Sequence, residues 1–364
     1  MVKPITIVGA HLLNDFSGSP LVFMQSLKTL QERDVILELH TAGSGAGFLD
    51  QLNLRKRIYP YRFFENRLLR LLAFMLSQAY LFFSMWRYWR REDVIIYVNT
   101  LLPFGAGLAG WLMGKKVVYH IHESYIQPAP LKFFLRKVAS LSADQVIYVS
   151  EYLMREEKIE GVKGIVVHNA LPDEFVRLAA QNAYDTRHQE VFTVLMVCSL
   201  KDYKGIPEFV QLAARHQDLQ FELVLNADES SIHGYFSKST MPANLRVFPV
   251  QQDLDSFYRR ASLVVNLTNP GSCIETFGMT ILEAMAYGVP VLAPPVGGPL
   301  ELVEEDRNGF TVDVRDEKLL DSRIHFLSRN PALMQVLSGG ARKTASRFAK
   351  STFDRKIEGI FSCL

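Results

Sequence analysis

The segment 271–291 reads GSCIETFGMTILEAMAYGVPV and directly follows an apolar, β-branched run at 263–267. This order predicts a strand, a short loop and then a helix. Glu275 falls in the loop, and Glu283 falls in the first turns of the helix. A helix N-terminus presents unpaired backbone amides that attract an anion. The amides in question are those of Phe277, Gly278, Met279 and Thr280.

The residue types in this segment favour a ligand that carries both phosphate and hydroxyl groups. Gly278 lets the backbone approach a phosphate closely, and Thr280 adds a hydroxyl. The carboxylates of Glu275 and Glu283 can accept hydrogen bonds from hydroxyl groups. A nucleoside diphosphate sugar offers a diphosphate, a ribose and a hexose, so it fits both kinds of group. The alternative is that the two glutamates are solvated side chains on a surface helix.

Outward from this segment, short apolar runs alternate with helical patterns almost from end to end. The first set of runs lies at 5–8, 35–39, 94–98, 117–121, 145–149 and 164–168, and the second set at 192–197, 221–225, 245–248, 263–267 and 289–293. Continuous apolar runs of this kind are typical of parallel strands covered by helices on both faces. The pattern predicts an α/β protein with two Rossmann-like domains.

The domain boundaries follow from the gap between the two sets of strands. Residues 169–190 contain Pro172, scattered charges and no clear strand, so we expect a linker there. The first domain is expected at 1–170 and the second at 171–347. The last segment, 348–364, is expected to be a helix that crosses back to the first domain.

Composition excludes several classes of protein. The chain has 364 residues, of which 48% are hydrophobic and 21% charged, which excludes disordered and collagen-like chains and indicates two domains. The net charge of +2 does not favour nucleic acid as a partner. The three cysteines show no C-x-x-C spacing, and the N-terminus shows no long apolar leader. These features indicate a cytoplasmic protein.

A basic and apolar segment at 55–91 stands apart from this pattern. Its centre, 68–89, is nearly all apolar, and nine Lys or Arg residues flank it. The run is slightly short for a membrane span and contains Ser77, Gln78 and Ser84. A buried helix that covers the sheet is the first interpretation. The second is contact with an anionic membrane surface, with the basic flanks and the clustered aromatic residues on the lipid.

Three motifs in the second half carry a family resemblance. The spacing E-x7-E at 275–283, then G-x-P-V at 288–291 and G-G-P-x-E at 297–301, resembles glycosyltransferase family 4. The resemblance implies a GT-B fold, in which two Rossmann-like domains face each other across a cleft. It also implies a retaining enzyme that uses a nucleotide-activated sugar. The donor would bind mainly to the second domain and the acceptor to the first.

The resemblance extends to the first strand and turn of the second domain. The family usually has Gly-Arg-Leu and then Lys-Gly here, and the Arg and Lys hold the donor diphosphate. Lys204 matches the lysine, whereas Ser199 stands where arginine is usual. Lys201 is a candidate replacement for that missing cation. The alternative for Lys204 is an ordinary solvated lysine at a helix start.

Two further positions belong to the first domain. Gly18 lies in the turn after the first strand, where the family has a glycine-rich turn facing the donor phosphates. His122 follows the strand at 117–121 and matches a family histidine that contacts the transferred sugar. The alternatives are a plain turn glycine and a loop histidine without a ligand. His120, two residues earlier, is expected in the core.

Together these residues predict a retaining glycosyltransferase. Lys204 and the helix amides would stabilise the departing diphosphate, Glu275 and His122 would hold the sugar, and Glu283 would bind the ribose. No metal or other cofactor is expected. By analogy, the acceptor is a saccharide or lipid-linked saccharide in surface polysaccharide or lipopolysaccharide biosynthesis. The alternatives are a non-hydrolysing sugar-nucleotide epimerase of the same fold and a degenerate glycosyltransferase that serves as a binding subunit.

Overall fold

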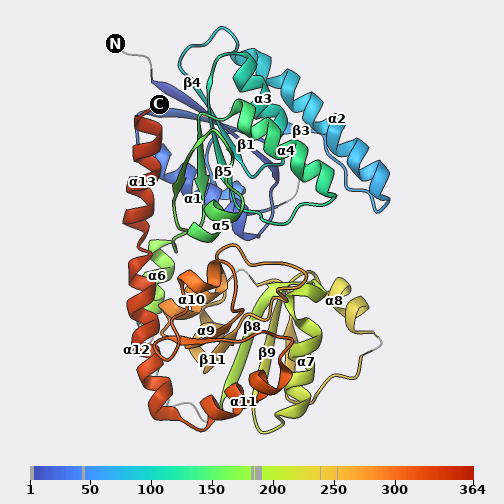
Figure 1. The fold of residues 1–364 in the computed structure, drawn as a ribbon, viewed down its shortest axis with the longest axis vertical. Coiled ribbons are helices and arrows are strands. Elements are labelled where there is room, and N and C mark those ends of the chain that lie inside the picture. Colours follow the sequence, from blue (N-terminus) through green and yellow to red (C-terminus); the bar gives the residue numbers. More distant parts are fainter. Residues whose placement is uncertain (1–3, 43–45, 182–183, 185–190, 238, 252) are drawn as a thin grey trace. The chain divides into compact units, whose positions relative to one another are not determined.

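The computed structural model describes residues 4–42, 46–181, 184, 191–237, 239–251 and 253–364. The chain forms two compact units (Figure 1). Unit 1 comprises Met1–Asn169 together with Ser351–Leu364, and unit 2 comprises Ala170–Lys350. Each unit has one parallel sheet flanked by helices, so the prediction of two Rossmann-like α/β domains is confirmed.

Unit 1 is built on a seven-stranded parallel sheet in the order β3-β2-β1-β4-β5-β6-β7. The strand β4 reads VIIYVN and is buried along its whole length, as expected of a central strand in a covered parallel sheet. The strands are β1 (Ile5–Leu13), β2 (Val35–Ala42), β3 (Arg55–Tyr59), β4 (Val94–Asn99), β5 (Lys116–Ile121), β6 (Gln145–Tyr148) and β7 (Lys163–Val166).

The edge strand β3 is absent from the sequence-based prediction, which took 55–57 as a basic flank of the apolar segment. Its sequence, RKRIY, has three cations in five residues, and only Tyr59 is buried. An edge strand faces solvent, so it tolerates charged side chains and lacks the apolar run by which inner strands are found. This part of the prediction was wrong.

The last helix lies almost wholly within unit 1. α13 (Lys350–Ser362) packs Phe361 against Tyr97 of β4, with ring centroids 4.9 Å apart. Lys356 Nζ donates to the Val166 carbonyl over 3.0 Å. The other helices and 3-10 turns of this unit are α1 (Gly18–Gln31), η1 (Phe48–Gln51), α2 (Arg67–Met85), η2 (Trp86–Tyr88), α3 (Phe104–Leu112), α4 (Ala129–Ser142) and α5 (Glu151–Glu156).

Unit 2 has a six-stranded parallel sheet in the order β10-β9-β8-β11-β12-β13. Its strands are β8 (Thr193–Ser199), β9 (Gln220–Asn226), β10 (Leu245–Phe248), β11 (Leu263–Val265), β12 (Val291–Ala293) and β13 (Gly309–Thr311). Its helices and 3-10 turns are α6 (Asp173–Gln181), η3 (Asp202–Lys204), α7 (Ile206–Arg215), α8 (Glu229–Phe236), α9 (Asp255–Arg260), α10 (Met279–Ala286), η4 (Gly298–Glu301), α11 (Glu317–Ser328) and α12 (Pro331–Arg347).

Two parts of unit 2 differ from the expected pattern. The three-residue strand β13 was not predicted, since so short a run carries little periodic signal. The segment 169–190, expected to be a linker, contains α6, where Phe175 packs against Tyr287. Residues 182–183 and 185–190 of that segment lie outside the described residues. Between them, Tyr184 is buried and donates its hydroxyl to the Ser262 carbonyl over 2.8 Å.

The apolar segment forms α2 and η2. Of all helices in the described part of the chain, only this one, at 67–88, is long and apolar enough to cross a membrane by length and composition. Only 28% of its most apolar window is buried. α2 packs against α3, and Figure 1 shows α2, α3 and α4 side by side. The expectation of a buried helix therefore holds for one stripe of α2 and fails for the rest.

Candidate functional site

The N-terminus of α10 is shaped by Gly278. This residue caps the helix with a φ of 105°, a conformation that favours glycine, and a Cβ there would lie 2.8 Å from the Ile281 side chain. Within the described part of the chain, the amides of Gly278, Met279 and Thr280 donate to no acceptor. They are therefore available to an anion. The Phe277 ring is buried and packs against Phe348.

Lys204 and Glu275 form an ion pair. Lys204 Nζ donates to Glu275 Oε2 over 2.7 Å, and each side chain is about a fifth exposed, at 20% and 21%. Lys204 ends η3, and Gly205 follows with a φ of 84°. A Cβ on Gly205 would lie 2.3 Å from the Leu267 carbonyl oxygen, so only glycine lets this turn pack against the end of β11.

Three other groups hold Glu275 in place. The Asn266 side chain lies beside its carboxylate, and the Thr268 hydroxyl holds Asn266 by donating to its Oδ1 over 2.7 Å. The Gly298 amide donates to the Glu275 carbonyl over 2.9 Å. Gly297 has a φ of 83°, and a Cβ there would lie 2.4 Å from that same carbonyl oxygen. The G-G-P motif at 297–299 therefore fixes the backbone of Glu275 by close packing and a hydrogen bond.

The ion pair keeps both of its groups charged. Burial raises the pKa of the Glu275 carboxyl. The charge and hydrogen bond of Lys204, together with Asn266 and Thr268, lower that pKa by a larger amount, so the net pKa lies below its usual value. For Lys204, burial lowers the pKa and the Glu275 charge raises it, with a net rise to about 12. Both groups are ionised throughout the neutral range.

Glu283 lies on α10 in a different environment. It is half-buried, and its one described hydrogen-bond donor is the Tyr258 hydroxyl of α9, 2.6 Å from Oε2. Burial is the main reason that the pKa of its carboxyl rises to about 7, and Tyr258 partly offsets it. Tyr258 is fully buried and stacks on Tyr287. Glu283 therefore changes charge near neutral pH.

Asn266, Thr268 and Tyr258 were missed by the sequence analysis. Asn266 and Thr268 directly follow β11, and ligand-binding residues gather at the carboxyl ends of parallel strands, so their position was a usable signal. Tyr258 lies 25 residues before Glu283, and only the fold brings the two side chains together.

Ser199 stands where the family usually has an arginine, and Lys201 is the candidate replacement for that cation. Ser199 ends β8, and its carbonyl accepts the Lys201 amide over 2.8 Å. The Lys201 side chain is exposed and forms no ion pair with any residue that the structure describes.

In unit 1, Asn99 connects His122 to the start of α1. Its Nδ2 donates to the Ser19 carbonyl over 3.3 Å and to Nδ1 of His11 over 3.0 Å. The carbonyl of Ser19 can only accept, so Oδ1 of Asn99 is the atom that faces His122 Nε2, 2.9 Å away. His122 Nε2 must then carry a proton, which leaves Nδ1 as an acceptor.

The histidines near Asn99 are neutral at physiological pH. Burial, with the neighbouring His120 and His11, lowers the pKa of His122 well below its usual value. His120 is fully buried in the core, as expected, and burial lowers its pKa to about 3. His122 can therefore hold a hydroxyl through Nδ1, but it does not supply a positive charge.

Gly18 is the first residue of α1 and has an ordinary backbone conformation. A Cβ built there would meet nothing within 4 Å, so packing does not require glycine at this position. Ser19, the next residue, bonds to Asn99, and the structure thereby brings Gly18 and His122 into one region of unit 1.

Among the described residues, no three His, Cys, Asp or Glu side chains cluster as a metal site. The chain has one Asp-x-Asp sequence, at 253–255. Asp255 bonds there to Arg259 over 2.7 Å and to the Tyr287 hydroxyl over 2.6 Å, and Asp253 accepts the Asp255 amide.

Comparison with known proteins covers both units. The family model of glycosyltransferase family 4 matches residues 17–175, and that of glycosyl transferases group 1 matches residues 179–344. The putative glycosyltransferase EpsD of Bacillus subtilis is 25% identical over 274 residues, which cover 68% of this chain and 70% of EpsD. Sucrose-phosphate synthase 4 of Arabidopsis thaliana is 30% identical over 99 residues, which cover 27% of this chain and only 9% of that protein.

Solved structures resemble the whole chain. HepE of Anabaena, solved in complex with UDP and glucose, matches with a TM-score of 0.78 at 20% identity, over 99% of this chain and 100% of that one. The sucrose-phosphate synthase of Thermosynechococcus elongatus matches with a TM-score of 0.75 at 18% identity, over 98% of both chains. At these identities the likeness establishes the fold, which is GT-B. The two family matches and this fold agree, and the chain belongs to the glycosyltransferases of family 4.

Proposed function

We propose that this glycosyltransferase moves a sugar from a nucleoside diphosphate sugar to a saccharide or lipid-linked saccharide, with retention of the anomeric configuration. The observation that carries the proposal is the Lys204–Glu275 ion pair, in which the two charged groups are 2.7 Å apart. Glu275 stands three residues before Gly278, the residue that caps α10. This arrangement sets a cation and unpaired amides beside a carboxylate. Such a set suits a ligand that has a diphosphate next to sugar hydroxyls.

Each residue has a proposed role. Lys204 has three ammonium donors, so it can keep its bond to Glu275 and still donate to the leaving diphosphate. The Gly278, Met279 and Thr280 amides, with that of Phe277, stabilise the same negative charge as it grows. Glu275 accepts from sugar hydroxyls, and Glu283 accepts from the ribose hydroxyls. In unit 1, His122 would hold the sugar through Nδ1, and Gly18 would let the backbone approach a phosphate.

We propose that retention follows from attack on the same face of the sugar as the departing diphosphate. The acceptor hydroxyl bonds to the anomeric carbon, the bond from that carbon to the diphosphate oxygen breaks, and the hydroxyl proton passes to the leaving phosphate. Lys201 is the proposed replacement for the cation missing at Ser199. No metal takes part in this proposal.

The setting proposed for this reaction is the cytoplasm, in the assembly of surface polysaccharide or lipopolysaccharide. HepE, a relative in fold, was solved with UDP-glucose, which makes UDP-sugars the first donors to try. Two rival functions use the same donor site. A sugar-nucleotide epimerase would convert the donor without an acceptor, and a degenerate binding subunit would bind the donor without turnover.

A two-stage experiment tests the proposal. A panel of nucleoside diphosphates and their sugars is first screened for a rise in Tm, since a ligand that binds only the folded protein stabilises it. The donors that bind are then incubated with candidate acceptors, and NMR reads the anomeric configuration of the product. Inversion would contradict the retaining mechanism, and acceptor-independent conversion would support the epimerase.

Matched lysine variants provide the control. Lys204→Met should abolish both the nucleotide-induced rise in Tm and transfer, whereas Lys318→Met, an exposed lysine of α11, should change neither. Normal transfer by a folded Lys204→Met variant would contradict the assignment. Binding without transfer for every donor and acceptor tried would favour the binding subunit.

A further inference from the structure

We propose that the outer face of α2 binds an anionic lipid surface, with the helix lying parallel to the membrane plane. We define this face by six side chains whose exposure is high for apolar residues; Leu68, Leu76 and Phe83, for instance, are 79%, 62% and 67% exposed. The six are Leu68, Leu69, Leu72, Leu76, Tyr80 and Phe83. This inference goes beyond the proposed sugar transfer, and it is tested by binding alone.

The helix differs from an ordinary surface helix, whose outer face is polar. Its polar residues Ser77 and Gln78 are buried, where Ser77 donates to the Phe74 carbonyl over 2.7 Å and Gln78 accepts the Gly105 amide over 3.3 Å. Its outer face carries no charged residue between Arg70 and Arg87. Phe74, Leu81 and Met85 complete the buried side, so α2 is apolar on both its inner and its outer face. A helix whose exposed face is apolar is suited to an apolar environment outside the protein.

The topology excludes a membrane-spanning role for α2. The strands before and after it, β3 and β4, belong to the same parallel sheet. The helix must therefore run back along that sheet, against α3, to connect them. Crossing a bilayer would separate two strands of one sheet. The face can meet the lipid only side-on.

The two ends of α2 have the charge that an anionic lipid surface attracts. Five arginines flank the helix, and in the described part of the chain none of them pairs with a carboxylate; they are Arg62, Arg67, Arg70, Arg87 and Arg90. The exposed aromatic residues Phe63 and Trp89 lie at opposite ends, as interfacial anchors do.

The structure corrects the number of basic residues available for lipid. The segment 55–91 contains nine cations, but three of them form ion pairs within unit 1. Lys56 pairs with Asp50, Arg57 with Glu38 and Arg91 with Asp93. The remaining six are Arg55 and the five arginines at the helix ends.

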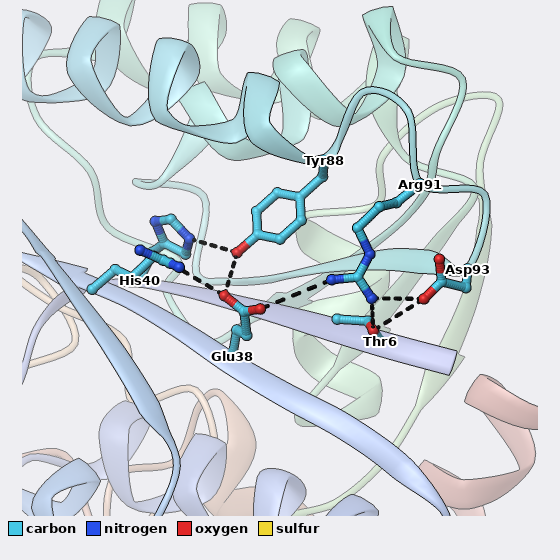
Figure 2. A network of polar contacts seen from close by, with 7 residues as sticks. Thr6, Glu38, His40, Tyr88, Arg91 and Asp93 are labelled. Carbon is cyan, nitrogen blue, oxygen red and sulfur yellow. Dashed lines mark hydrogen bonds and ion pairs between the residues drawn. The ribbon is translucent and has the colours of Figure 1, made fainter. Parts of the chain in front are cut away.

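The Arg91–Asp93 pair belongs to a polar network that fixes the C-terminal end of α2 (Figure 2). Tyr88 of η2 donates to Glu38 over 2.8 Å and accepts from His40 over 3.2 Å. Arg91 bonds to Asp93 over 2.6 Å and also to Thr6. At the other end, the Asn66 side chain caps the helix. The helix is therefore held firmly on the sheet with its apolar face outward.

The charges at the ends of α2 favour a lipid surface over a second copy of the chain as the partner of this face. If two copies packed through this face, arginines would meet arginines in either orientation, because both ends of the helix are basic. Like charges at such an interface are repulsive. Anionic headgroups complement both ends at once, and the apolar face can enter the layer between them. A lipid surface is therefore the occupant that the observations favour.

The test is sedimentation of the full chain with vesicles of phosphatidylcholine alone or with 30% phosphatidylglycerol. The protein should bind the anionic vesicles at low salt and dissociate as salt rises. Changing Arg62, Arg67 and Arg70 to Glu should lower binding by about 100-fold or more, because each arginine near an anionic surface contributes roughly fivefold. Absence of binding to anionic vesicles at low salt would overturn the proposal.

A second variant isolates the apolar face. The triple change of Leu72, Leu76 and Phe83 to Ser should weaken vesicle binding at any salt concentration, and the fold should tolerate it because all three are exposed. The matched control changes Leu319, Phe326 and Val336 of unit 2, also exposed, to Ser and should bind as the parent does. If the face instead binds a second copy of the chain, the parent would dimerise and the variant at Leu72, Leu76 and Phe83 would be monomeric. Neither protein would then bind vesicles.

Discussion

The Lys204–Glu275 pair is open to a double-mutant cycle. We compare the parent with Lys204→Met, Glu275→Gln and the combined variant. Breaking a fully buried ion pair by removing one partner costs about 3–5 kcal/mol. Here each side chain is about a fifth exposed, and Asn266 still stabilises the Glu275 carboxylate after Lys204 is lost. We therefore expect Lys204→Met to lower the free energy of unfolding by about 2 kcal/mol.

The combined variant carries the sharper expectation. With both charges gone, neither partner is left buried and uncompensated, so the loss should be smaller than the sum of the two single losses. We expect a coupling free energy of about 1–2 kcal/mol. For a unit of this size, a loss of 2 kcal/mol lowers Tm by roughly 4–8 °C.

Calorimetry and urea titration measure the cycle, and pH checks its cause. The lowered pKa of Glu275 makes its contribution to stability present above its unfolded pKa and lost only in acid. The raised pKa of Lys204, about 12, makes its contribution present below its unfolded pKa and lost only in strong base. The coupling should therefore be the same at pH 6 and pH 9. Additive single losses, or a coupling that varies across this range, would refute the reasoning.

Four further predictions concern ligand binding and turnover. Because the pKa of Glu283 is about 7, a nucleoside diphosphate sugar should bind up to about 10-fold more tightly at pH 8 than at pH 6, and calorimetric titration should show no such change for Glu283→Gln. Glu275→Gln should instead reduce transfer more than donor binding; a reversed pattern would mean that the two roles are exchanged. Transfer should persist in EDTA, and a loss that magnesium or manganese restores would contradict a metal-free site. Asn99→Ala should lower kcat by about 10-fold because it frees His122 to rotate. Asn99 is fully buried, so Tm falls as well and kcat is measured well below it; an unchanged kcat would show that Asn99 does not position His122.

The local sequence was enough to predict the fold and to select a compact group of candidate site residues. The inner strands are runs such as VIIYVN, whose apolar character reflects burial on both faces, so they could be located without coordinates. Glu275, Gly278 and Glu283 lie within nine residues of one another, between a strand and a helix. Their relation is local, and local geometry follows from sequence spacing.

Only the tertiary structure identified the partners of these residues and the orientation of α2. Tyr258 reaches Glu283, and Asn99 reaches His122, across strands and loops that no short spacing connects. The segment 67–85 is apolar around nearly its whole circumference, so its periodicity cannot say which side faces inward. Packing against α3 decided it, because Gln78 found the Gly105 amide there, and an unpaired amide side chain is costly to bury.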